Sequence, residues 1–360
     1  MAVSRIDEAG LNVTQYGNRN LIINGAMEVA QRGTSTTSVS STGYYACDRY
    51  RAAFTRAEYV CTVSQDTSAP NGFASSYKIA TTTVESTLSA GDQVNITQRL
   101  EGQDLQRFKK GTADAEQFTV SFWVKSSIAT TWSFSLYDAD NSRHCSKTYT
   151  TNAANTWEYK TITFPADTTG SFDNDNAASL YCRFWLDGGT DYTSGTQQSS
   201  SWASYDNTNE QYASTGFMTT ASSTWQITGF QLEVGDTATG FEHRSYGDEL
   251  ARCQRYYYQI AGNAKFVGHG FYFSSSEFDV EVNFPVTMRA SPTFTSSSSP
   301  NDFRIVPWVD DFNAFSGSQY FDGNKMNLWN SSGVSGTKGD AGMVSMRNAS
   351  TSKVQFDAEL

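Results

Sequence analysis

Residues 225–235 have the sequence WQITGFQLEVG, in which the parity of the apolar positions changes half-way. The apolar residues are Trp225, Ile227, Phe230, Leu232 and Val234. In an extended chain, the first two of these share one face and the last three share the other. A strand that keeps them all on the core side needs one extra residue, and glycine suits that position best. The stretch therefore predicts a strand with a bulge at Thr228-Gly229, in a sheet covered on one side.

The alternation ends after Gly235, and a helix signal follows it. Residues 245–248 (Ser-Tyr-Gly-Asp) form a capping-box pattern, which marks the start of a helix. We expect this helix over residues 248–259, within a linking segment at 247–259. The linking segment would separate a first domain at 20–246 from a second at 260–360.

Short alternating segments occur on both sides of the predicted helix. In the first domain they lie at residues 76–81, 94–100, 118–125, 131–137, 157–164 and 179–187. Gly, Asn, Asp and Ser separate these segments, which is typical of a β-sandwich. Residues 260–360 contain further short segments of the same kind. The sequence thus predicts an all-β protein with a β-sandwich, a short linking helix and a second, smaller β-sandwich.

Composition excludes several classes of function. The 360 residues suffice for two domains, and the net charge of -11 disfavours a nucleic-acid partner. No apolar run approaches the ~20 residues that a membrane-spanning helix needs, and we expect no membrane insertion. Residues 1–17 lack the apolar core of a signal peptide, so we expect synthesis in a cytoplasm. The five cysteines lack metal-site spacing, so zinc is not expected.

Three blocks of sequence carry a resemblance to a known family. They are NLIINGAMEVAQRGT…YYACDRY at 20–50, QRLEGQDLQRFKKGTADAEQFTVSFWVKSS at 98–127, and ITGFQLEVGDTATGFEHRSYGDELARCQRYYY at 227–258. In this order they resemble the carbohydrate-binding-type jelly rolls of tail-fibre and other virion proteins of tailed bacteriophages. The resemblance covers roughly residues 20–258 and implies a jelly-roll topology for the first domain.

The resemblance also implies a role in the virion. It predicts a tail-fibre or receptor-binding protein, made in the host cytoplasm, whose jelly roll contacts host-surface glycan without catalysis. Residues 1–19 would form either an arm that attaches to other virion proteins or a disordered tail. By analogy with similar fibres, which are usually trimers, we expect a homotrimer held through the aromatic-rich residues 260–360. A glycan depolymerase of the tail and a purely structural fibre or adaptor of head or tail remain alternatives.

Candidate carbohydrate-binding residues lie opposite the apolar set of one predicted strand. Aromatic rings stack on sugar rings, and polar side chains bond sugar hydroxyls. The candidates on strand 179–187 are Tyr181, Arg183, Trp185 and Asp187. Trp123 on strand 118–125, together with Trp202 and Tyr205 in the long polar segment 187–222, completes the set. Packing under that segment, or against a neighbouring subunit, is the alternative interpretation of these rings.

The sequence shows no catalytic or metal-binding motif. Glycosidases need two carboxylates at a set separation, and the neighbouring pairs Asp187/Asp191 and Asp310/Asp311 are more typical of solvated turns. We therefore expect no enzymatic activity and no cofactor. A structural calcium ion is common in similar jelly rolls, but no ligand spacing identifies a site for one.

Overall fold

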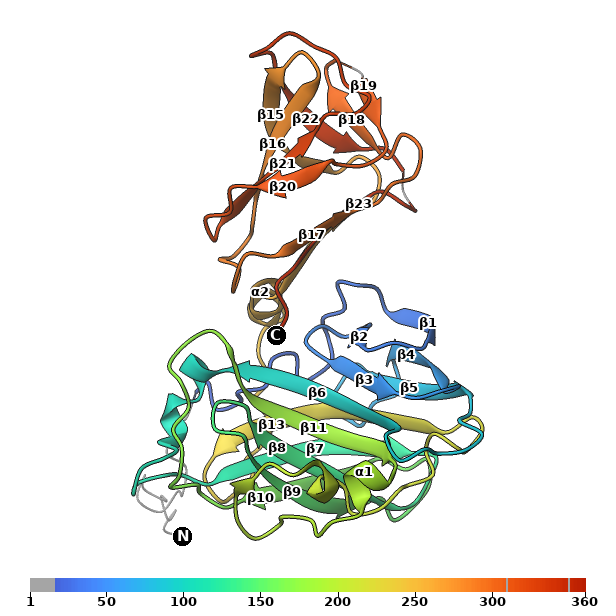
Figure 1. Cartoon of the computed structure of the whole chain (residues 1–360), viewed down its shortest axis with the longest axis vertical. Helices are drawn as coiled ribbons and strands as arrows, with labels where there is room; N and C mark the ends of the chain where they lie inside the picture. The colour runs from blue at the N-terminus through green and yellow to red at the C-terminus, as the bar shows by residue number, and fades with distance from the viewer. Residues whose placement is uncertain (1–16, 309, 349) are drawn as a thin grey trace, which may run out of the picture. The chain divides into compact units, whose positions relative to one another are not determined.

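The computed structural model describes residues 17–308, 310–348 and 350–360 (Figure 1). The chain divides into two compact units, one up to Glu249 together with Leu360, and one from Leu250 to Glu359. We call them unit 1 and unit 2. The boundary falls inside helix α2 (Tyr246–Gln254), close to the predicted division. Most of the predicted attachment arm at 1–19 lies outside the described residues.

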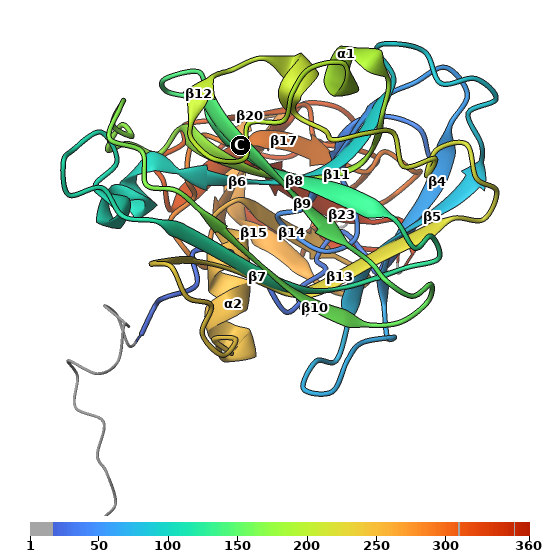
Figure 2. The ribbon, with the colours of Figure 1, turned by 90° about the horizontal axis from the view of Figure 1, so that it is seen from below.

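Unit 1 is a jelly-roll sandwich of two antiparallel sheets. The six-stranded sheet contains, in spatial order, β1 (Ser35–Val39), β4 (Val60–Asp66), β5 (Ser76–Thr83), β13 (Thr224–Val234), β7 (Phe118–Ser126) and β10 (Glu158–Phe164). The seven-stranded sheet contains β12 (Ala203–Ser204), β9 (Arg143–Thr150), β8 (Thr131–Asp138), β11 (Ala178–Gly188), β6 (Gln93–Glu101), β3 (Arg51–Thr55) and β2 (Gly43–Tyr44). From β5 to β8 the chain changes sheet at every step, as in a jelly roll. Figure 2 shows the two layers, with β7, β13 and β10 in one and β8, β11 and β6 in the other.

Aromatic side chains from both sheets fill the core of unit 1. Phe184 of β11 lies at the centre, with its ring centroid 5.0 Å from that of Phe122 and 4.9 Å from that of Phe230. Trp225 contacts the same ring at 5.4 Å. All four residues are at most 1% exposed. The apolar alternation in the sequence therefore does mark the inward faces of these strands.

The predicted bulge in β13 is confirmed. The pairing of β13 with β7 shifts register between Thr228 and Gln231, and Gly229 between them has φ +63°. A Cβ on Gly229 would lie 2.7 Å from Cζ of Phe73, so both the backbone angle and the space require glycine. The expectation that the sheet is covered on one side is wrong here, because the polar residues of β13 are buried as well.

The segment just after Gly17 runs alongside β13 and bonds its backbone beyond the part that pairs with β5. Leu21 N donates to Leu232 O at 3.0 Å, and Phe230 N donates to Gly25 O at 3.0 Å. Asn20 Oδ1 accepts from Leu232 N at 3.1 Å, and its Nδ2 donates to Phe230 O at 3.1 Å. The first and last of the three blocks that carry the family resemblance are thus in direct contact.

Helix α2 follows the predicted capping pattern but begins at Tyr246, two residues before the predicted start at 248. Ser245 Oγ accepts from Asp248 N at 3.2 Å and is 2.7 Å from Asp248 Oδ2. The helix ends at Gln254, so the predicted range of 248–259 is too long. Tyr257–Ala261 instead forms strand β14, in which Tyr258 lies opposite Phe356.

Unit 2 is the smaller β-sandwich. Its three-stranded sheet contains β14, β23 (Lys353–Asp357) and β17 (Thr293–Ser296). Its seven-stranded sheet contains β19 (Asp310–Phe312), β18 (Phe303–Val306), β22 (Ala341–Met346), β15 (Phe266–Ser274), β16 (Glu277–Asn283), β21 (Lys325–Asn330) and β20 (Gly317–Gln319). One core joins them, with Phe356 of β23 5.0 Å from Phe284 and 5.5 Å from Phe294. The fold is therefore all-β in both units, as predicted.

Candidate binding site

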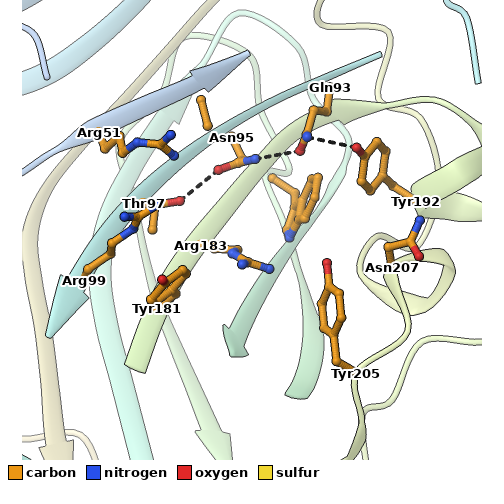
Figure 3. Close-up of a pocket in the computed structure, with 12 residues that line it drawn as sticks. Arg51, Gln93, Asn95, Thr97, Arg99, Tyr181, Arg183, Tyr192, Tyr205 and Asn207 are labelled. Carbon is orange, nitrogen blue, oxygen red and sulfur yellow. Dashed lines mark hydrogen bonds between the residues drawn. The ribbon is translucent and has the colours of Figure 1, made fainter. Parts of the chain in front are cut away.

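The outer face of the seven-stranded sheet in unit 1 carries a pocket of about 390 Å³ (Figure 3). The side chains that line it come from β3, β6 and β11 and from the segment that follows β11. They are Arg51, Ala53, Gln93, Asn95, Thr97, Arg99, Tyr181, Arg183, Trp185, Tyr192, Tyr205 and Asn207. All the lining residues on strands have odd numbers, because alternate side chains of a strand share a face.

The strand register brings these side chains together in rows. Thr97 of β6 lies between Arg51 of β3 and Arg183 of β11 in the pairing. In the next row along β6, Arg99 lies opposite Tyr181. Neighbouring strands are about 4.8 Å apart, so Arg51 and Arg183 project from backbone positions separated by about 10 Å. The three guanidinium groups therefore share one small area of the sheet.

Residues 189–212, which we call the covering loop, lie over one end of this face. The loop is attached to the sheet by Gln197, whose Nε2 donates to Ser146 Oγ at 2.8 Å, and by Ser146 N, which donates to Gln198 O at 2.8 Å. It contains α1 (Thr190–Thr193) and the 3-10 turn η4 (Asn207–Asn209). Tyr192 and Tyr205 thereby reach the pocket from the side opposite β3 (Figure 3).

Hydrogen bonds hold a row of polar side chains along β6. Thr97 Oγ1 donates to Asn95 Oδ1 at 2.8 Å, and Asn95 Nδ2 donates to Gln93 Oε1 at 2.9 Å. Gln93 Nε2 then donates to the Tyr192 hydroxyl at 2.9 Å. The chain of bonds fixes the orientation of each amide before a ligand binds, which lowers the entropy lost on binding.

The arginines stack on the tyrosines of the same face. The Arg99 guanidinium carbon lies 4.5 Å from the ring centroid of Tyr181, and that of Arg183 lies 4.6 Å from the ring of Tyr137. Such cation–π contacts hold the side chains in place without consuming all their hydrogen-bond donors. Burial of Arg51, together with the charge of Arg99, lowers the pKa of Arg51 below its ordinary value.

A buried carboxylate supports the floor of the pocket. Trp185 is 2% exposed, and its Nε1 donates to Glu210 Oε2 at 3.0 Å. Glu210 also contacts Nδ1 of His144 at 2.9 Å and lies 3.6 Å from Nη1 of Arg183. Burial alone would raise the pKa of Glu210, but the hydrogen bond from His144 and the charge of Arg183 outweigh burial and lower it. Glu210 is therefore ionised and fixes both Trp185 and Arg183.

Four of the seven predicted site residues line this pocket: Tyr181, Arg183, Trp185 and Tyr205. Trp185 forms the floor and is nearly buried, whereas Tyr205 is 36% exposed. The predicted packing of rings under the segment 187–222 also occurs, since Trp185 lies 5.2 Å from the ring of Tyr192. The two interpretations of these rings are compatible in the structure.

Asp187 does not belong to this face, contrary to the prediction. The pairing of β11 with β6 shifts register between Trp185 and Asp187, so the alternation of faces is interrupted there. Asp187 is fully buried and accepts hydrogen bonds from Ser214 Oγ at 2.7 Å and Met218 N at 2.9 Å. Its role in the fold is to hold the chain that leads into β13.

Trp123 and Trp202 also lie elsewhere. Trp123 is half-buried on the outer face of the six-stranded sheet, 5.4 Å from the ring of Tyr159. Trp202 is 6% exposed, and its Nε1 donates to Pro165 O at 2.8 Å. Its ring packs 5.5 Å from Phe118, so it belongs to the core. The grouping of these two tryptophans with Tyr181 is therefore not supported.

Several pocket residues were missed by the sequence analysis. The polar residues Gln93, Asn95, Thr97 and Arg99 occupy every second position of β6, and three of the positions that alternate with them are the apolar Val94, Ile96 and Leu100. The row could therefore be predicted from the sequence once β6 was treated as a strand with two different faces. Arg51 was missed because β3 was not predicted. Glu210 and His144 gave no local signal, since they are 66 residues apart in the sequence.

The site gives no indication of acid–base or metal chemistry. Of the described residues that line the pocket, none is Asp or Glu. Within the described ranges, no group of three or more His, Cys, Asp or Glu side chains is arranged to hold a metal ion. All five cysteines are buried. None of the helices formed by the described residues combines the length and apolar character needed to cross a membrane.

Unit 2 carries a larger cavity of about 960 Å³ on the outer face of its own seven-stranded sheet. The ring-bearing and charged residues that line it include Phe271, Phe273, Tyr320, Asp279, Glu281 and Lys325. Phe273 is 53% exposed, and Lys325 pairs with Glu281 at 2.9 Å. Asp279 is 8% exposed, its Oδ1 has no hydrogen-bond partner, and burial raises its pKa.

Comparisons with known proteins add little beyond the fold. No protein-family profile and no curated protein matches the sequence. Among solved structures, 60% of the chain aligns with the enzymatically active domain of tailspike protein 4 of Bacteriophage CBA120, at 14% identity and a TM-score of 0.31. The aligned part spans only 21% of that tailspike chain.

Two carbohydrate-binding modules show a similar degree of likeness. TmCBM61, solved with beta-1,4-galactotriose, aligns over 60% of this chain and 99% of its own, at 10% identity and a TM-score of 0.31. The family 11 module of the cellulosomal cellulase Lic26A-Cel5E of Clostridium thermocellum aligns over 56% and 100%, at 12% identity and a TM-score of 0.29. TM-scores this low carry no argument about function, which rests on the pocket itself.

Proposed function

We propose that this protein binds glycan through the pocket on the outer face of the seven-stranded sheet of unit 1, without cleaving it. The observation that carries this proposal is the preformed combination of tyrosine rings, a hydrogen-bonded row of amide side chains and guanidinium donors around one cavity. Rings can stack on the apolar faces of sugars, and the amides and guanidinium groups can bond the hydroxyls.

A binding role is favoured over glycan cleavage by the chemistry of the lining. Hydrolysis of a glycosidic bond uses a pair of carboxyl groups that flank the bond. The lining of this pocket contains none, and Glu210, which accepts a hydrogen bond from Nε1 of Trp185, is fully buried. The depolymerase alternative therefore has no supporting observation in this pocket.

The sequence resemblance supports a place for this protein in a phage virion. We propose that it is a tail-fibre or receptor-binding component that contacts host-surface glycan, with residues 1–19 as the attachment arm. We further propose a homotrimer joined through unit 2, where the exposed large side chains include Phe266, Phe271, Phe273, Trp308 and Tyr320. Light scattering tests the trimer, and a mass near that of the 39.7 kDa chain would contradict it.

The glycan-binding proposal is tested with a matched pair of tyrosine variants. Both Tyr205 and Tyr159 are partly exposed in unit 1, but Tyr205 lines the pocket and Tyr159 lies on the other sheet beside Trp123. We expect Tyr205→Ala to weaken binding of the full chain to host-surface polysaccharide at least tenfold, and Tyr159→Ala to leave it unchanged. Thermal unfolding of both variants controls for folding.

Other outcomes would contradict the assignment of the glycan site to this pocket. Loss of binding in Tyr159→Ala alone would assign it to the outer face of the six-stranded sheet. Unchanged binding in both would exclude either face as the main contact. Trp185→Ala is a poor choice for this test, because that side chain is nearly buried and its removal leaves a cavity.

A further inference from the structure

We propose that the pocket of unit 1 selects glycans that carry acidic groups, such as the carboxylate of a uronic acid. This inference names the ligand class of the proposed glycan site and rests on that proposed function. It is drawn from the charges around the pocket, their partners and the chemistry of the surrounding rings and amides.

The lining of the pocket concentrates positive charge against the trend of the chain. The protein has 37 acidic and 26 basic residues, yet this pocket is lined by three arginines and by no acidic residue. The nearby carboxylate of Glu210 balances part of one charge only, at 3.6 Å from Nη1 of Arg183. Placing like charges together is unfavourable, and a bound anion removes this cost.

The guanidinium group of Arg51 has hydrogen-bond donors that no other described residue engages. The side chain of Arg51 is half-buried at the pocket and makes no hydrogen bond or ion pair with the residues that the structure describes. Its neighbour Arg99 differs, because Arg99 Nη1 donates to Leu360 O at 2.7 Å and its guanidinium covers Tyr181. The planar guanidinium of Arg51 can offer two parallel N–H groups to a carboxylate.

The remaining lining favours an acidic sugar over a generic polyanion. The cavity of about 390 Å³ is closed at one end by Tyr192 and Tyr205 of the covering loop, and its floor is the indole of Trp185. The oriented amides of Gln93 and Asn95 lie along the same strand as Arg99 and suit sugar hydroxyls. A sugar ring with one carboxylate uses all of these features together.

The test uses an array of bacterial surface polysaccharides, with each acidic polymer immobilised in its native and its carboxyl-reduced form beside neutral polymers. We expect the full chain to bind acidic polymers, with at least tenfold weaker binding after carboxyl reduction. Arg51→Gln should lower binding of the native acidic polymer to about the level of its reduced form. Arg51→Lys keeps the positive charge but cannot offer two parallel N–H groups. Its binding of the native acidic polymer should fall between that of the unchanged chain and that of Arg51→Gln.

Lys109→Gln is the matched control, because it removes one positive charge of unit 1 from an exposed residue outside the pocket. It should leave binding unchanged. Equal binding of native and reduced polymers would overturn the selection for acidic groups while leaving glycan binding intact. Equal binding of single-stranded DNA would also overturn it, in favour of a general polyanion site. Binding to no polysaccharide at all would instead remove the proposed function itself.

Discussion

The outer faces of the two seven-stranded sheets both expose aromatic and charged residues, but they differ in how these are supported. In unit 1, Trp185 donates a hydrogen bond to Glu210, and Arg183 stacks on Tyr137. In unit 2, Phe273 is about half exposed, and Asp279 has a buried oxygen without a hydrogen-bond partner. The pocket of unit 1 is lined by arginines, whereas that of unit 2 has more carboxylates than cations.

This difference shows that residue types alone do not define a binding site on a sheet. In unit 1 the covering loop adds a second layer, which buries Glu210 and orients the side chains on the sheet beneath it. A buried carboxylate whose oxygens all have hydrogen-bond partners stabilises the side chains around it. A buried carboxylate with an unpaired oxygen destabilises the fold, because no hydrogen bond offsets the cost of removing that oxygen from water. We infer that the face in unit 1 is preorganised for a ligand and that the face in unit 2 lacks this support.

The largest expected difference concerns the aromatic side chains of the two faces. Trp185→Ala should lower the free energy of unfolding of unit 1 by about 3–5 kcal/mol, because it removes a buried ring and leaves a cavity. Phe273→Ala should change unit 2 by no more than about 0.5 kcal/mol, since half of its ring already faces solvent. Calorimetry of the full chain measures both. Comparable losses would show that the two faces are equally packed.

The next difference concerns the two carboxylates. Glu210→Gln should cost unit 1 about 3 kcal/mol, because the amide cannot neutralise Arg183 or accept at both oxygens from its donors. Asp279→Asn should change unit 2 by only about 0.5 kcal/mol at neutral pH, because the carboxylate it replaces has an oxygen without a partner. Urea unfolding followed by hydrogen exchange in each unit separates these effects. A large loss in Asp279→Asn would reveal a partner of Asp279 in solution.

The smallest difference is in the response to pH. The raised pKa of Asp279 means that its contribution to stability is fully present below the unfolded value of about 3.9 and is lost as the pH rises through the folded value. The lowered pKa of Glu210 has the opposite sign: its contribution is present above about 4.3 and is lost as the pH falls through the folded value.

We therefore expect acidification from pH 7 to pH 4.5 to slow hydrogen exchange in β16 of the wild type relative to Asp279→Asn at the same pH. In the segment around Glu210, the ratio of hydrogen-exchange rates between the wild type and Asp279→Asn should not change between pH 7 and pH 4.5. An unchanged ratio between wild type and variant in β16 would show that Asp279 titrates normally.

Much of the sandwich was readable from local patterns, but the site was readable only in part. The alternation in residues 179–187 placed Tyr181, Arg183 and Trp185 on the outer face correctly. The same alternation misplaced Asp187, because a bulge between β11 and β6 depends on the partner strand and leaves no mark in β11 alone. Trp202 was grouped with exposed rings because a polar loop gives no indication of which of its residues enter the core.

The sequence by itself determined where many of the strands run, where β13 bulges and which residue caps α2, because periodicity, the glycine at 229 and the Ser245 cap act between neighbouring residues. Tertiary structure alone decided that the covering loop returns to bury Glu210 against Nε1 of Trp185, and that Asn20 binds the backbone of β13 more than 200 residues away. Such contacts depend on shape and on polar groups that must find partners once buried. Neither requirement is confined to one stretch of chain.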